Sequence, residues 1–253
     1  MLDFDEIKDI ARLKRLSLIN TEKDYLQDLI LFSLYSRLNK EIIFKGGTCL
    51  YKIYKLNRFS EDLDFTLTKN IDFKKLIPKL MKDISLLNIN VKLKEFKKYK
   101  NEINIRFLFN SMLYKGTKES QCFIPLNISL KEKILSEPKK EILTSLYKEI
   151  PTFEVYAMNE KEILAEKIRA ILTREKPRDI YDLWFLIAKR ETPLDMNLIN
   201  KKLKLYNISF SKDEFIKSIN RKKGLWNLDL KNLIVSELPN FDIVRENIIS
   251  KII

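Results

Sequence analysis

Histidine is absent from the 253 residues of this sequence, and glycine and cysteine are scarce. The lack of histidine excludes Ser-His-Asp and Cys-His catalysis, histidine general bases and zinc sites that use histidine. The four glycines argue against an all-β fold, which would need many tight turns. The two cysteines, Cys49 and Cys122, are too few for a zinc cluster or a disulfide framework and fit a reducing compartment.

Signals for export or membrane insertion are also missing. No apolar run approaches the roughly 18 residues needed to span a bilayer. The N-terminus has no basic region followed by an apolar core. We therefore expect a cytoplasmic protein with no membrane partner.

Charge is what the sequence has in abundance. Hydrophobic residues make up 45% of the chain and charged residues 33%, which indicates a soluble globular protein. The formal net charge of +13 favours a polyanionic partner, with nucleic acid as the first expectation. The alternative is a lysine-rich composition whose charge is spread evenly over the surface.

The most informative stretch covers residues 42–67. A short apolar run predicts a strand that ends at Gly46 and Gly47, where glycine permits a tight turn. A helical spacing of apolar residues follows. A second strand then alternates apolar residues with Asp62 and Asp64, whose side chains should therefore lie on the same face.

Asp62 and Asp64 form the first half of a candidate site. Two neighbouring carboxylates repel each other unless a cation lies between them. Carboxylate oxygens suit Mg²⁺, which proteins bind through one or two carboxylates together with substrate phosphates. The preceding Ser60 and the amides of Gly46 and Gly47 could hold a phosphate. The alternative is an amphipathic strand with a solvated acidic face that follows a glycine turn.

Lys167 belongs to the second half. It lies on or beside the apolar face of a helix predicted over 160–173, where a lysine needs an anionic partner. Asp179 and Asp182, on the next predicted helix, are carboxylates that could supply one. The alternatives are that Lys167 extends outward to solvent and that Asp179 only complements the N-terminus of its helix.

Periodicity predicts the remaining elements. Thr21 is the expected N-cap of the second helix, and Asn159 with Glu162 matches a capping box. The pattern changes near residue 158, so we predict an α/β domain over residues 1–157 and a helical-bundle domain over residues 158–253. The predicted helices cover 3–17, 22–38, 73–87, 160–173, 178–189, 195–206, 211–222, 228–238 and 241–253, and the later strands cover 91–99, 103–109, 123–130 and 152–157.

Two blocks of residues resemble the AbiEii/AbiGii toxin family, which belongs to the polymerase-β-like nucleotidyltransferase superfamily. The resemblance spans the region from the first strand to the helix after Lys167. Its two blocks are Gly46-Gly47-Thr48 with Arg58-x-Ser60-x-Asp62-x-Asp64-Phe65, and Glu166-Lys167 with Arg178-Asp179-x-Tyr181-Asp182-Leu183.

This resemblance implies an α+β fold: a mixed-sheet nucleotidyltransferase domain with N-terminal helices, followed by a C-terminal helical domain that completes the site. It implies metal-dependent transfer of a nucleotidyl group from an NTP to an acceptor. The expected acceptor is RNA, in particular tRNA, and the expected biological role is that of a type IV-like toxin with a separately encoded antitoxin protein.

The resemblance also assigns roles to residues. Asp62 and Asp64 would bind Mg²⁺ or Mn²⁺, and the catalytic set would be Asp62, Asp64, Lys167 and Asp182. Asn127 and Asp179 are additional candidates. The residues expected to bind the nucleotide are Gly46, Gly47, Thr48, Arg58, Ser60 and Lys167.

Asn127 departs from the superfamily pattern. Members commonly carry a third metal-binding carboxylate on a later strand, where this chain has Pro125-Leu-Asn-Ile-Ser. An amide oxygen can coordinate Mg²⁺ weakly but cannot act as a base or neutralise charge. The chain would then rely on Asp182, use a single metal, or have lost activity. Two further function classes therefore stay open: a catalytically decayed nucleic-acid-binding protein on the same scaffold, and nucleotidyl transfer to a protein or a small molecule.

Overall fold

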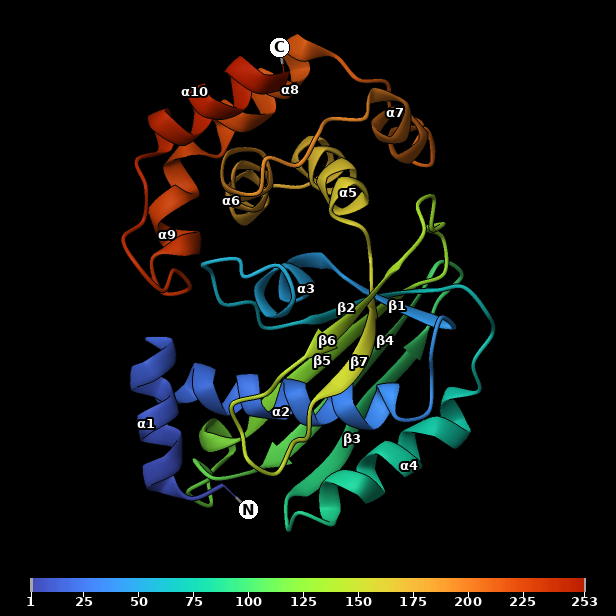
Figure 1. The fold of residues 1–253 in the computed structure, drawn as a ribbon, viewed down its shortest axis with the longest axis vertical. Helices are drawn as coiled ribbons and strands as arrows, with labels where there is room; N and C mark the ends of the chain where they lie inside the picture. Colours follow the sequence, from blue (N-terminus) through green and yellow to red (C-terminus); the bar gives the residue numbers. More distant parts are fainter. Residues whose placement is uncertain (1, 253) are drawn as a thin grey trace. The chain divides into compact units, whose positions relative to one another are not determined.

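The computed structural model describes residues 2–252, which divide into two compact units (Figure 1). The first unit contains the chain up to Lys55 together with Phe59–Ile134 and Pro138–Ala157. The second contains Leu56–Arg58, Leu135–Glu137 and the chain from Met158 onward. Residues 1 and 253, which the predicted domains and the predicted last helix include, lie outside the described part.

The first unit is built on one mixed sheet, as predicted. Its strands are β1 (Ile42–Lys45), β2 (Leu63–Leu67), β3 (Asn90–Lys98), β4 (Glu102–Asn110), β5 (Cys122–Ser129), β6 (Lys139–Leu143) and β7 (Phe153–Ala157). Within the described residues their order is β3-β4-β5-β2-β1-β7-β6. The central strand β2 pairs antiparallel with β1 and parallel with β5, and β1 pairs parallel with β7.

Helices cover one face of this sheet. α2 (Leu18–Tyr35) and α4 (Phe73–Ser85) lie on it, and α1 (Phe4–Lys14) packs against α2. α3 (Gly46–Lys52) contacts β1 and β2, and a short 3₁₀ turn, η1 (Lys118–Ser120), precedes β5. α2 packs on β5 and β7 and alongside α4, which packs on β3 (Figure 1). The face beneath them is apolar, with Phe65, Phe107 and Leu126 at 0–1% exposure. The opposite face carries the polar residues of the alternating pattern and is called the open face below.

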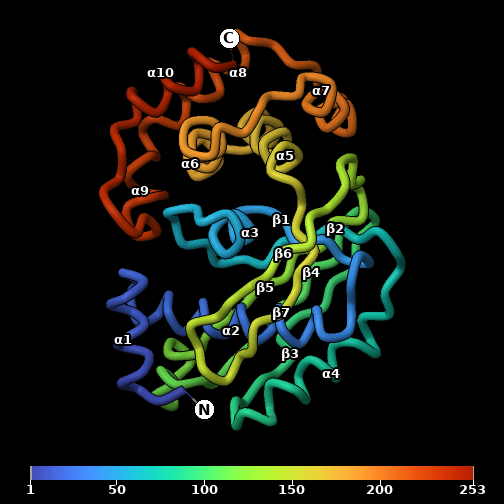
Figure 2. Tube along the Cα trace, viewed as in Figure 1, coloured from blue at the N-terminus to red at the C-terminus, as the bar shows by residue number. Residues whose placement is uncertain are grey.

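The second unit is helical, as the sequence predicts for the C-terminal part. It contains α5 (Glu160–Thr173), α6 (Arg178–Trp184), the π-helical turn η2 (Phe185–Lys189), α7 (Met196–Lys204), α8 (Lys212–Arg221), the 3₁₀ turn η3 (Lys223–Leu225), α9 (Trp226–Leu230) and α10 (Phe241–Ile252). α5 packs against α6, α7 and α8, and α6 packs against α9 and α10 (Figure 2, yellow to red). Ile168, Phe215 and Val244 are fully buried in its core.

One predicted helix cap and one predicted capping box are wrong. α2 begins one turn earlier than expected, because the hydroxyl of Ser17 accepts the N–H of Asn20 at 3.1 Å, whereas the hydroxyl of Thr21 donates to the Ser17 carbonyl. Asn159 does cap α5 by accepting the N–H of Lys161. The carboxylate of Glu162 does not complete a capping box, because it accepts backbone N–H groups of the segment 135–137 instead.

Three element assignments also differ. The short strand β6 was not predicted. The helix expected over 178–189 changes from α to π geometry after Trp184, and the helix expected over 228–238 is only the short α9. After α9 the chain turns over residues 231–233, and Ile234 then forms an antiparallel bridge with Arg58. A tertiary partner therefore overrides the helical pattern there.

Candidate functional site

β2 presents the two predicted carboxylates. Asp62 immediately precedes the strand and Asp64 is its second residue, and both are half-buried. Leu63 and Phe65, which alternate with them, are fully buried. The apolar residues thus hold the strand on the core while the open face receives the acidic side chains, as strand alternation requires. The predicted alternation is confirmed from Leu63 to Phe65, whereas Thr66 is buried and Leu67 is half-buried.

Gly46 brings the backbone at the start of α3 against Asp64. Its φ of +74° lies in the left-handed region, and a Cβ built on it would lie 2.5 Å from Oδ2 of Asp64. Any residue other than glycine would therefore have to displace the carboxylate. Gly47 follows as the second residue of α3 and is buried. The glycine turn and the acidic strand consequently form one contiguous structure.

Side chains from two helices hold the segment that leads into β2. The hydroxyl of Thr48 in α3 donates to the carbonyl of Asp62. The amide of Gln27 in α2 donates to the carbonyl of Ser60 at 2.9 Å and to that of Glu61 at 2.8 Å. Ser60 is buried. Gln27 was not among the predicted site residues, although its position as a polar residue within the apolar face of a predicted helix is a signal that could have identified it.

Asn127 is the direct neighbour of Asp64. The two residues are register partners in the parallel β2–β5 pair, and Nδ2 of Asn127 donates to Oδ1 of Asp64 at 3.1 Å. The position that the resemblance associates with a third carboxylate therefore does adjoin the acidic pair. Here it supplies a neutral donor, which relieves the repulsion that a further carboxylate would add.

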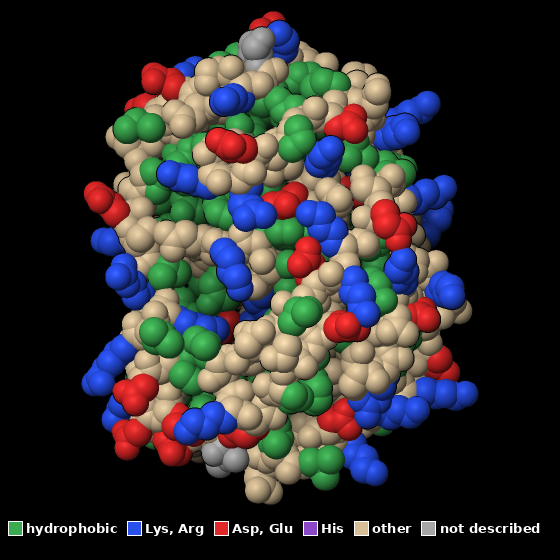
Figure 3. Space-filling view, in the orientation of Figure 1, with side chains coloured by type: hydrophobic (Ala, Val, Ile, Leu, Met, Phe, Trp, Pro, Cys, Tyr) green, Lys and Arg blue, Asp and Glu red, His purple; other side chains and the backbone are tan. Residues whose placement is uncertain are grey.

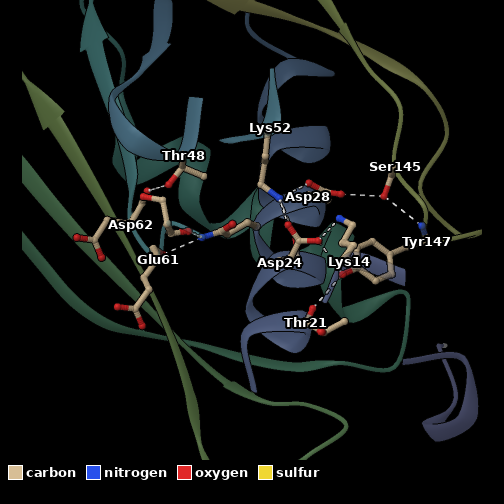
Figure 4. A network of polar contacts seen from close by, with 12 residues as sticks. Lys14, Thr21, Asp24, Asp28, Thr48, Lys52, Glu61, Asp62, Ser145 and Tyr147 are labelled. Carbon is tan, nitrogen blue, oxygen red and sulfur yellow. Dashed lines mark hydrogen bonds and ion pairs between the residues drawn. The ribbon is translucent and has the colours of Figure 1, made fainter. Parts of the chain in front are cut away.

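A buried ion-pair network joins α3 to α2 (Figure 4). Nζ of Lys52 in α3 lies 2.7 Å from Oδ1 of Asp24 and 2.6 Å from Oδ1 of Asp28, both in α2. Lys14 also pairs with Asp24, and the Tyr147 hydroxyl donates to the same carboxylate at 2.8 Å. Burial raises the pKa of Asp24, but Lys52 and Lys14 outweigh it and lower the pKa to about 2. The glycine turn is therefore anchored through its own helix.

This network was also missed by the sequence analysis. Its signal is a pair of acidic residues four positions apart, Asp24 and Asp28, inside the apolar face predicted for 22–38. Carboxylates at such positions must be paired, because an isolated buried charge is strongly unfavourable. The partner, Lys52, is remote in sequence and cannot be identified from helical spacing.

In the second unit, Lys167 is held by two carboxylates. Its Nζ lies 2.9 Å from Oδ1 of Asp179 and 2.6 Å from Oδ2 of Asp182. Both carboxylates are fully buried and Lys167 is 6% exposed. The expectation that a buried lysine here has an anionic partner is confirmed, and the alternative of an outward-extending side chain is wrong. Arg174 also binds Asp179, with its Nε 2.7 Å from Oδ2 of that carboxylate.

Arg58 completes this cluster from a distant part of the chain. Its Nε and Nη2 each donate to a different oxygen of Asp182 at 2.9 Å, and the guanidinium is 1% exposed. Burial raises the pKa of Asp182, but Arg58 first and then Lys167 outweigh it, so the net pKa is lowered. Arg58 was expected in the first domain as a nucleotide ligand, whereas the structure groups it with the second unit, bound to Asp182.

The candidate residues thus form two clusters. The first unit joins the glycine turn, Asp62, Asp64 and Asn127, and the second joins Lys167, Asp179, Asp182 and Arg58. The convergence of the two clusters on one substrate stays a prediction. Among residues 2–252, no group of three or more Asp, Glu, Cys or His side chains is arranged to hold a metal ion. Over the same residues, no helix combines the length and apolar character that a bilayer crossing requires.

The fold and the acidic strand beside a glycine turn define a protein of the nucleotidyltransferase class. The family model of the nucleotidyl transferase AbiEii toxin of type IV toxin–antitoxin systems matches residues 29–247. The chain therefore belongs to this family. None of the curated proteins gives a significant sequence match.

Solved structures show the same fold. MenT4, a nucleotidyltransferase toxin from Mycobacterium tuberculosis, is 16% identical in sequence and superposes with a TM-score of 0.67. The match covers 97% of this chain and 87% of the MenT4 chain. JHP933 from Helicobacter pylori is 23% identical in sequence and superposes with a TM-score of 0.61. The match covers 93% of this chain and 91% of the JHP933 chain.

Proposed function

We propose that this protein transfers a nucleotidyl group from an NTP to a hydroxyl of an RNA acceptor, and that it acts as the toxin of a pair with a cognate antitoxin. The observation that carries the proposal is the acidic pair, Asp62 and Asp64, on the open face beside a turn that must be glycine. Family membership supports the reaction class. The net charge of +13 supports a polyanionic acceptor.

Asp62 and Asp64 would hold Mg²⁺ or Mn²⁺. Two half-buried carboxylates fit an ion that takes its remaining ligands from substrate phosphates and water, even though within residues 2–252 they are not part of a group of three or more acidic ligands. When bound, the ion would neutralise charge on the triphosphate and polarise the phosphoryl group under attack. Asn127 would keep its hydrogen bond to Asp64 and orient that carboxylate.

The other site residues would bind and orient the nucleotide. The amides of Gly46 and Gly47 would face the triphosphate, with Thr48 and Ser60 maintaining the backbone on either side. Lys167 would neutralise phosphate charge once the two clusters meet on the substrate. Such a contact requires Lys167 to exchange part of its binding to the buried carboxylates for the phosphate.

Asp182 and Asp179 would act as positioning residues. Both oxygens of Asp182 bind Arg58, and one also binds Lys167, so this carboxylate is committed to cations rather than to a metal. Its lowered pKa makes it a weak base at neutral pH. We therefore assign it the task of holding Lys167, and we assign the corresponding task to Asp179.

The test is to incubate the protein with each radiolabelled NTP, Mg²⁺ and total RNA, and to run the Asp64→Asn variant beside it. Label on an RNA species that requires both Mg²⁺ and Asp64 supports the proposal. Label on protein or on a small molecule would show that the acceptor is not RNA. Equal labelling by the variant would show that the site is elsewhere.

Asn127 favours one alternative function. A scaffold that has lost a carboxylate beside Asp64 could bind nucleic acid without catalysis. That alternative requires RNA binding that is unaffected by Mg²⁺ and NTP, with no label transferred under any condition. The incubation described above separates the two functions.

A further inference from the structure

A polar row crosses the open face of the sheet, starting at Asp64. Asp64 of β2 is the register partner of Asn127 in β5, Asn127 is that of Asn104 in β4, and Asn104 is that of Lys97 in β3. Directly paired residues point to the same face, so the four side chains share the face that carries the acidic pair. The row ends at β3, which lies at one edge of the sheet (Figure 1).

The residues on the other face of the same strands are apolar. Ile105 and Leu126 are 2% and 1% exposed, whereas Asn104 and Asn127 are half-buried and Lys97 is exposed. β4 and β5 are interior strands of the sheet, and their open face still carries amides. Half-buried amides of this kind can bind water and exchange it for a polar ligand.

The chemistry changes along the row. The row has a carboxylate on β2, an amide on each of β5 and β4, and the Lys97 ammonium on β3. Arg106, which is exposed and belongs to the adjacent row of the same face, adds a second cation. With strands about 4.8 Å apart, the row extends about 14 Å from β2 to β3. Amides can donate to and accept from base edges, and the cations can neutralise phosphates.

Charge alone does not reveal such a surface. On the face drawn in Figure 3, basic and acidic side chains are intermixed. Glu95 illustrates this on β3, because it pairs with Lys97 at 2.9 Å and is the register partner of Arg106. A phosphate bound by these two cations would therefore compete with the Glu95 carboxylate.

We infer that this row binds the single-stranded end of the RNA acceptor. The terminal nucleotide, which carries the reacting hydroxyl, lies toward Asp64, and the preceding nucleotides cross Asn127 and Asn104. Their phosphates reach Lys97 and Arg106. This inference rests on the proposed function, since it takes RNA as the acceptor.

Lys97 and Lys98 provide a matched pair of variants. They are adjacent and exposed, but they point to opposite faces of β3, because Lys98 is the register partner of Ile103. Lys97→Glu and Lys98→Glu therefore change the net charge equally and affect opposite faces. Lys97→Glu also removes the exposed ion pair with Glu95, and the melting temperature reports any effect of that loss on folding. Binding is measured for a single-stranded RNA oligonucleotide and for a blunt RNA duplex at fixed salt, alongside NTP binding and the melting temperature.

Lys97→Glu should weaken binding of the single strand about tenfold and lower the salt dependence by about 0.7 in the log–log slope, while Lys98→Glu stays within about twofold of the wild type. Glu95→Gln should strengthen binding, because it releases both cations. NTP affinity should not change in any of these variants. Asn104→Leu should raise the KM for RNA and leave kcat at saturating RNA unchanged.

Equal weakening by Lys97→Glu and Lys98→Glu would refute the inference, because only net charge would then matter. Tighter binding of the duplex than of the single strand would also refute it. These outcomes are separate from a failure of the proposed function. If nucleotidyl transfer to RNA is observed and the two lysine variants have equal effects, the proposed function stands and this surface is rejected. If RNA binding depends on the face but no transfer occurs, the surface stands and the proposed function is rejected.

Discussion

Replacing Gly46 with alanine tests how closely the glycine turn and Asp64 are coupled. The new Cβ would lie 2.5 Å from Oδ2 of Asp64, against an ordinary non-bonded separation of about 3.5 Å. The carboxylate must therefore move by about 1 Å, and a displacement of this size at a reacting centre costs about a hundredfold in rate. The left-handed backbone adds about 1–2 kcal/mol of destabilisation.

Gly116→Ala is the matched control. Gly116 also has a positive φ, of +82°, but nothing lies within 4 Å of a Cβ built on it. Both variants should lose about 2–8 °C in melting temperature. Only Gly46→Ala should lose about a hundredfold in nucleotidyl transfer and require more Mg²⁺. Equal transfer rates in the two variants would show that Asp64 does not need its present position.

Three further predictions concern the charged residues. Asn127→Asp should lower the melting temperature in EDTA, because a second carboxylate replaces the donor to Asp64, and Mg²⁺ should restore it; an unchanged Mg²⁺ midpoint would place residue 127 outside the metal site. Lys167→Ala should lower both NTP affinity and stability, the latter on the order of 3 kcal/mol, since it leaves two buried carboxylates with one cation fewer; urea unfolding together with NTP titration measures both, and unchanged stability would contradict the buried pairs. The pKa of Asp182 is lowered in the folded state, so its ionised carboxylate stabilises the fold at pH values above the unfolded pKa of about 4. This stabilisation is lost as the pH falls through the folded pKa. Urea unfolding from about pH 7 to about pH 3 should show stability falling only at the acid end, and Lys167→Ala should make that fall smaller, because it moves the folded pKa of Asp182 toward the unfolded value.

The elements that carry the acidic pair could be predicted because local pattern and burial agree there. In β2 the half-buried Asp64 lies between the buried Leu63 and Phe65, and α5 keeps a helical apolar period over its whole length. Predictions from local sequence patterns failed where a side chain binds a group that is distant in sequence. Glu162 fits the sequence of a capping box, yet two backbone N–H groups near residue 135 bind its carboxylate.

The candidate site shows the same limit. The carboxylates and Lys167 could be selected from residue type and spacing, and the need of Lys167 for an anion followed from its apolar face. The partner of Arg58 could not be predicted, because the Arg58–Asp182 contact joins residues 124 positions apart. Lys52 with Asp24 and Asp28 is a similar case. Helical and strand periods contain no information on such pairs.

The make-up of the second unit affects how this protein can be divided or inherited. The unit includes 56–58, which supplies the guanidinium for Asp182, and 135–137, which supplies backbone donors for Glu162. A fragment cut at residue 158 would lack both and would leave buried acids without these partners. A functional exchange of this unit between relatives must therefore transfer two tripeptides from within the other unit as well. The two parts should consequently change together in evolution, and recombination at a single junction should yield unstable hybrids.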